Sequence, residues 1–148
     1  MLTRITLCAA LLWSFAARAS EMKIVYDVIE GNGEKLYGRI ESIDITRESL
    51  VKQGVTPRFV LTFRGPATKL VQTDMEKVKP EDRQWAAKIA ERLAAMSKMP
   101  GVAIEQCAVA IQHQGTSRDK VLPVIKVVDN SFITIAAYQS QGYAYILP

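Results

Sequence analysis

The sequence has few of the residues on which metal and redox sites depend. It contains one histidine, His113, and two cysteines, Cys8 and Cys107. A single histidine with no cysteine or carboxylate at ligand spacing does not make a metal site. The absence of a Cys-x-x-Cys pair argues against a thioredoxin-like oxidoreductase. The turn at residues 31–33 lacks the third glycine and the lysine of nucleotide-binding loops, so we expect neither a metal nor a cofactor.

Long hydrophobic runs are also scarce. The one long run, from Ile5 to Phe15, is too short to span a bilayer. It follows Arg4 and precedes Ala17-Arg18-Ala19, the small-x-small pattern of a signal-peptide cleavage site. We therefore predict a signal peptide over residues 1–19, one mature domain over 20–148, and a periplasmic or secreted protein without membrane attachment. An uncleaved N-terminal anchor is the alternative.

The mature domain would have little net charge and one thiol. Arg4 and Arg18 leave with the signal peptide and no acidic residue does, so the net charge falls from +4 to +2. Clustered Lys/Arg interleaved with aromatics is absent, which leaves nucleic-acid binding unsupported. Because Cys8 also leaves, Cys107 cannot form an internal disulfide. In an oxidising compartment we expect it to be an inert buried thiol, half of an intermolecular redox bridge, or a reactive site.

Apolar, β-branched segments alternate with amphipathic segments about five times along the chain. This alternation predicts a single α/β domain with three α/β/α layers and a mainly parallel five-stranded sheet. The expected strands are residues 23–28, 58–63, 102–106, 124–128 and 143–147. The expected helices are 34–52, 67–72, one that opens at Pro80 and ends at Met99-Pro100-Gly101, 108–114, and 132–141, the last capped by Asp129-Asn130-Ser131.

Chemically useful side chains follow several of these expected strands. Binding sites of open α/β sheets lie outside the carboxyl ends of the strands. The residues at those ends are Asp27, Arg64-Gly65, Cys107 and Asp129-Asn130. Cys107 is therefore a candidate by its position as well as by its residue type.

Short motifs are spread over the whole mature chain. They are Met22-Lys23-Ile24-Val25-Tyr26, Arg64-Gly65-Pro66, Gly101-Val102 followed by Cys107, Leu122-Pro123 with Val127-Val128, and the terminal Gln139-x-x-Gly142-Tyr143-Ala144-Tyr145-Ile146-x-Pro148. With these motifs the sequence from Lys23 to Pro148 resembles the DsrE/DsrF-like family of small sulfur-relay proteins. The terminal motif is the most specific of them.

The resemblance implies a function for Cys107. Active family members carry a persulfide on a cysteine at this position and exchange it with a donor or acceptor protein or a small sulfur species, without a cofactor. The resemblance also implies homo-oligomers, often trimers or hexamers. Around the cysteine, Arg64 with Gly65 and Arg118 are candidates to bind an anionic sulfur species, and His113 is a candidate base. A solvated arginine in a turn and a surface histidine are the competing interpretations.

The residues after the cysteine support a second hypothesis. The run Cys107-Ala108-Val109-Ala110-Ile111 offers no polar side chain to a thiolate or an incoming sulfur atom. The chain would then be a non-catalytic oligomeric binding module in which Cys107 is a packing residue. At most, the activity would be that of a sulfurtransferase-like sulfur carrier.

Overall fold

The computed structural model describes residues 20–148, so the predicted signal peptide and Cys8 lie outside the described residues. Its centre is a five-stranded, all-parallel sheet in the order β4-β3-β2-β1-β5. The strands are β1 (Glu21–Val28), β2 (Thr56–Phe63), β3 (Val102–Cys107), β4 (Lys126–Val128) and β5 (Ala144–Ile146). The predicted α/β fold in a single domain is confirmed.

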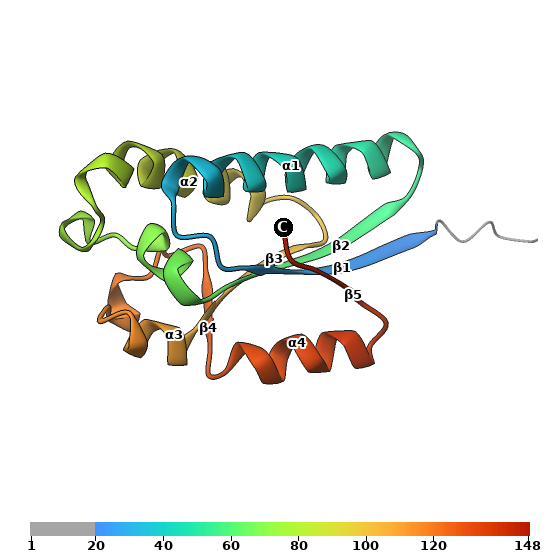
Figure 1. The fold of residues 1–148 in the computed structure, drawn as a ribbon. Helices are drawn as coiled ribbons and strands as arrows, with labels where there is room; N and C mark the ends of the chain where they lie inside the picture. The colour runs from blue at the N-terminus through green and yellow to red at the C-terminus, as the bar shows by residue number, and fades with distance from the viewer. Residues whose placement is uncertain (1–19) are drawn as a thin grey trace, which may run out of the picture.

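Helices cover both faces of the sheet (Figure 1). The helices α1 (Gly33–Lys52) and α2 (Arg83–Met96) lie on one face, and α3 (Ala108–His113) and α4 (Ser131–Ser140) lie on the other. Short 3-10 helices fill the connections: η1 (Gly65–Val71), η2 (Met75–Lys77), η3 (Pro80–Asp82) and η4 (Arg118–Lys120).

Three differences from the sequence-based expectation are the clearest. The helix expected from Pro80 opens with the 3-10 turn η3 and becomes α-helical at Arg83, and the Asp82 carboxylate accepts the Gly33 N–H at 2.7 Å and does not cap α2. The short helix expected at 67–72 is the 3-10 helix η1. The fourth strand begins only at Lys126.

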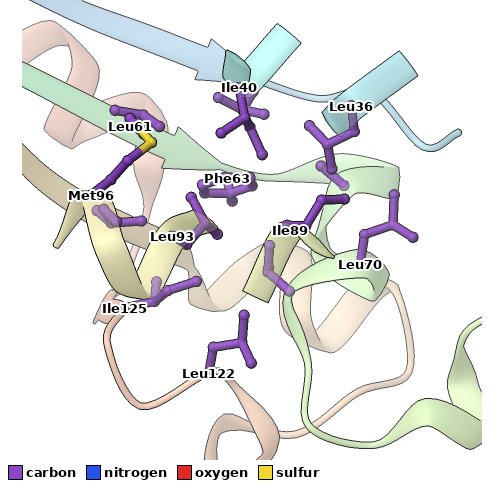
Figure 2. Close-up of a cluster of buried hydrophobic side chains, with 14 of the residues drawn as sticks. Leu36, Ile40, Leu61, Phe63, Leu70, Ile89, Leu93, Met96, Leu122 and Ile125 are labelled. Carbon is purple, nitrogen blue, oxygen red and sulfur yellow. The ribbon is translucent and has the colours of Figure 1, made fainter. Parts of the chain in front are cut away.

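The main core lies between the sheet and the α1/α2 layer (Figure 2). Side chains alternate between the two faces of each strand, and one set meets the apolar stripes of both helices. The fully buried members include Leu36, Ile40, Leu61, Phe63, Ile89, Leu93 and Met96. Val51, near the end of α1, is an exception among its apolar residues because it is 52 % exposed.

The face beneath α4 has a much smaller apolar cluster. Its buried members are Val25, Val60 and Ile135, with Tyr138 and Tyr143 packed against them. The α4 helix is thus anchored to the sheet by few apolar side chains, and the Tyr138 hydroxyl adds a hydrogen bond to Glu105 of β3 at 2.9 Å.

One glycine fixes how β3 starts beside β2. Gly101 has a φ of +79°, and a Cβ there would lie 2.2 Å from the carbonyl oxygen of Pro57. Only glycine fits such a close approach at positive φ. The strand that follows therefore runs directly alongside β2 to its end at Cys107.

Candidate functional site

Cys107 lies where β3 ends and α3 begins. It is the last residue of the strand and the N-cap of the helix. Its thiol is free and only 4 % of the residue is exposed. It forms part of the wall of a cleft of about 280 Å³ at the carboxyl edge of the sheet. The cleft is lined by Arg64, Gly65, Cys107, Val109, Ala110, His113, Gln114, Asn130, Ser131 and Phe132.

The first turn of α4 faces the sulfur of Cys107. The backbone N–H of Ser131, the first residue of that helix, donates to Cys107 Sγ at 3.4 Å. Asn130 caps the helix by accepting the N–H of Phe132 at 3.0 Å. Because the N–H groups at a helix N-terminus carry partial positive charge, this arrangement favours an anionic sulfur.

Two opposing effects set the pKa of Cys107. Burial raises the pKa, because it disfavours the charged form. Hydrogen bonds from the side chain and N–H of Ser131, and then from the N–H groups of Ala110 and Val109, lower it. The net result is a pKa below the ordinary value of a cysteine. A larger fraction of the thiol is therefore thiolate near neutral pH, and the thiolate is the nucleophile.

The hydroxyl of Ser131 has an unusual environment. It is fully buried and makes no hydrogen bond of ordinary geometry with any residue from 20 to 148. Its proton is therefore available to turn toward Sγ when the sulfur is charged, which is how it lowers the pKa of Cys107. Polar support for the thiolate thus comes from α4 and from backbone groups, not from side chains that follow the cysteine in sequence.

Arg64 and Gly65 lie in the same cleft as Cys107. The Arg64 guanidinium is paired with a buried carboxylate: its Nε and Nη2 donate to Asp27 Oδ1 and Oδ2 at 2.7 and 2.6 Å. This pairing raises the pKa of Arg64, and the hydrogen bond that the guanidinium donates to Asp27 is the main cause. Gly65 turns the chain away from β2 with a φ of +55°.

The two remaining candidates are separated. His113, the last residue of α3, is exposed and lines the cleft. Arg118 lines a neighbouring hollow with Val109 and pairs with Asp129 at 3.2 Å. The structure therefore brings Arg64, Gly65 and His113 together with Cys107 and leaves Arg118 outside the cleft.

Sequence reasoning did not assign the site residues Ser131 and Phe132. The predicted helix cap at Asp129-Asn130-Ser131 was the sequence feature that could have identified them. The strand before it pairs with β3, with Val128 in register with Cys107, so a helix capped there begins beside the cysteine. The pairing of these two strands was the missing information.

Two further features are absent from residues 20–148. No helix in this range is long and apolar enough to span a membrane. In the same range no group of three histidine, cysteine or carboxylate side chains is arranged to hold a metal ion.

Comparison with solved structures relates the fold to two proteins. The chain is similar to a protein of unknown function, MTH1491, from Methanobacterium thermoautotrophicum, with a TM-score of 0.68 and 17% identity over 86% of this chain and 99% of that one. It is also similar to the ychN protein from E. coli, with a TM-score of 0.52 and 16% identity over 85% of this chain and 98% of that one. At these identities the likeness concerns the fold alone.

Sequence comparison identifies a relative and a family for the chain. It is 30% identical over 128 residues to an uncharacterized protein of Aquifex aeolicus (strain VF5), an alignment that covers 86% of this chain. The alignment covers 56% of that relative, so the chain spans little more than half its length. The model of the DsrE/DsrF-like family matches residues 16–148. The chain belongs to the DsrE/DsrF-like family.

Proposed function

We propose that the protein is a sulfur carrier that holds and exchanges a persulfide on Cys107. The observation that carries the proposal is the contact between the Ser131 N–H and Cys107 Sγ at the edge of a cleft. A buried cysteine that only filled space would have no need of a helix N-terminus directed at its sulfur.

The proposed step is a displacement at sulfur. The Cys107 thiolate attacks the outer sulfur of a persulfide, R–S–SH, and forms a new S–S bond. The S–S bond of the donor breaks, and the inner sulfur leaves as the thiolate R–S⁻ with the bonding electron pair. Cys107 then carries the outer sulfur as –S–SH, and the reverse step passes it to an acceptor thiolate. The step needs no metal and no external oxidant.

Intact mass measurement tests this proposal. The folded protein is incubated with polysulfide, and we expect a gain of one or more sulfur atoms that a reductant reverses. The Cys107→Ser variant gives the background. No adduct on the wild type, or an equal adduct on the variant, would refute the proposal.

One observation favours the second candidate, a non-catalytic binding module. Only 4 % of Cys107 is exposed, as is usual for a packing cysteine. This candidate expects native Cys107 to resist iodoacetamide and to react only after unfolding. Rapid alkylation of the native protein would exclude it.

We also propose that the carrier is a homo-oligomer that joins through α4. No charged side chain occurs between Asn130 and Pro148. At the start of α4, Phe132 and Ile133 are 64 % and 70 % exposed, and on the edge strand Tyr145 and Ile146 are also exposed. Large uncharged apolar surfaces are typical of interfaces. We expect sedimentation to give a trimer or hexamer that Ile133→Glu dissociates, and a monomeric wild type would contradict this.

The proposed location is outside the cytoplasm. It follows from the signal-peptide pattern over residues 1–19. N-terminal sequencing of the protein from the periplasmic or secreted fraction should begin at Ser20. A cytoplasmic protein with an intact N-terminus would refute it.

A further inference from the structure

The cationic side chain that lines the Cys107 cleft is already neutralised. Of the lining residues only Arg64 has a permanent positive charge. Two parallel hydrogen bonds of 2.7 and 2.6 Å tie its guanidinium to Asp27, which is almost fully buried. Such bidentate pairs are the strongest and most directional contacts that a guanidinium makes with a carboxylate.

Two aromatic side chains keep the pair in place. The Tyr145 hydroxyl on β5 donates to Asp27 Oδ2 at 2.7 Å, so the carboxylate accepts three hydrogen bonds. The Phe132 ring on α4 lies 4.8 Å from Arg64 Cζ and covers the guanidinium. The guanidinium cannot swing toward a ligand without leaving a buried carboxylate short of donors, which is costly.

We propose that Asp27 is a specificity-determining residue of the Cys107 cleft, which cancels the charge of Arg64 and so disfavours doubly charged sulfur oxyanions such as thiosulfate. Tyr145 positions the Asp27 carboxylate through the hydrogen bond from its hydroxyl. The substrate side of this inference rests on the proposed sulfur-carrier function. The electrostatic side concerns the cleft itself and is testable without any sulfur transfer.

The physical reason is repulsion between anions. The nucleophile is a thiolate, so a doubly charged donor meets like charge as it approaches. An unpaired arginine in the wall would offset that repulsion, whereas a paired one leaves it in place. The end of a persulfide has one negative charge, or none when protonated, and meets little or no repulsion. The cleft would therefore admit persulfide sulfur more readily than a sulfur oxyanion.

The test compares two alkylating reagents of nearly equal size. Iodoacetate is negatively charged and iodoacetamide is neutral, so the ratio of their rates at Cys107 reports the charge of the cleft. We expect Asp27→Asn, which leaves Arg64 unpaired, to raise the ratio about fivefold at low salt. The increase should shrink in about 1 M salt, where the screening length is only about 3 Å.

Two further variants complete the design. The double variant Asp27→Asn/Arg64→Gln has a neutral pair in place of the ion pair, and we expect it to keep the wild-type ratio. Asp44→Asn is the matched control: Asp44 is similarly buried and paired with Arg47 and Arg92, but it belongs to α1, on the other face of the sheet. It should leave the ratio unchanged.

Thiosulfate provides the direct readout of specificity. It should protect Cys107 of Asp27→Asn from iodoacetamide and give the wild type no protection at the same concentration. An unchanged ratio in Asp27→Asn, an equal rise in Asp44→Asn, or equal protection of the wild type would overturn the proposal. If Asp27→Asn does not fold, a wild-type ratio well above that of the double variant would overturn it. None of these outcomes depends on whether Cys107 accepts sulfur.

Discussion

Replacing Ser131 with alanine should change reactivity and stability in opposite directions. The hydroxyl is buried and unpartnered within residues 20–148, yet it lowers the pKa of Cys107. In the thiol form of the protein it is a desolvated group without a hydrogen bond. In the thiolate form it becomes a donor to a charged sulfur. The same group therefore costs stability and supports reactivity.

The size of both effects follows from this geometry. A hydrogen bond to the thiolate that is outside ideal geometry should be worth about 1 kcal/mol, so Ser131→Ala should slow alkylation of Cys107 about fivefold below its pKa. Removing a buried, unpartnered hydroxyl should stabilise the protein by about 1 kcal/mol, or about 4 °C in Tm. Above the pKa the alkylation rates of variant and wild type should converge, because both thiols are then ionised.

Iodoacetamide rates from pH 5 to pH 10, together with thermal unfolding, measure both effects. Ser140→Ala is the matched control, because Ser140 is at the opposite end of α4 and bonds only the Ala137 carbonyl. It should leave the pH profile of the alkylation rate at Cys107 unchanged. A Ser131→Ala variant with a wild-type rate profile, or with a lowered Tm, would refute the reasoning.

Three further predictions concern stability, and each is measured by urea unfolding. The folded-state pKa of Cys107 lies below the ordinary 9.0, so the thiolate stabilises the fold above pH 9.0, and this stabilisation is lost as the pH falls through the folded-state pKa. The free energy of unfolding of the wild type relative to Cys107→Ala should therefore rise from pH 6 to pH 9. A difference that falls over this range would contradict the prediction. Within residues 20–148, the Tyr138 hydroxyl is the one side-chain donor to the buried Glu105 carboxylate, at 2.9 Å, so Tyr138→Phe should lower the free energy of unfolding by about 2 kcal/mol. An unchanged urea midpoint would show that this hydrogen bond does not contribute to stability. Gly101→Ala must place a Cβ against the Pro57 carbonyl at positive φ and should cost at least about 2 kcal/mol, so a neutral substitution would mean that the backbone there can relax.

The fold could be predicted because each element has a strong local signal. The apolar stripe of Ile89, Leu93 and Met96 marks α2, and all three are fully buried. The β-branched run before Asp27 marks β1. Boundaries were less predictable where tertiary contacts decide them. The α-helix expected from Pro80 begins only at Arg83, and the carboxylate of Asp82 before it accepts the N–H of Gly33, 49 residues away.

The site was only half predictable from the sequence. The position of Cys107 follows from the rule that sites lie at the carboxyl ends of parallel strands, but its polar partners do not follow it in the chain. Ser131 is 24 residues away, and the pairing of Arg64 with Asp27 spans 37 residues. Such contacts depend on strand order, and a single sequence does not specify strand order.

The order in which the chain is made gives β5 a particular consequence. The strand pairs with β1, and Ala144 lies opposite Ile24, 120 residues earlier in the chain, so this edge of the sheet closes only after residues 144–146 have been synthesised. Contacts between residues so far apart in sequence slow folding, because a long loop must be closed before they form. Ser131 likewise follows Cys107 by 24 residues, so the thiol of a nascent chain would lack this activating contact until the start of α4 has been synthesised and has packed beside it.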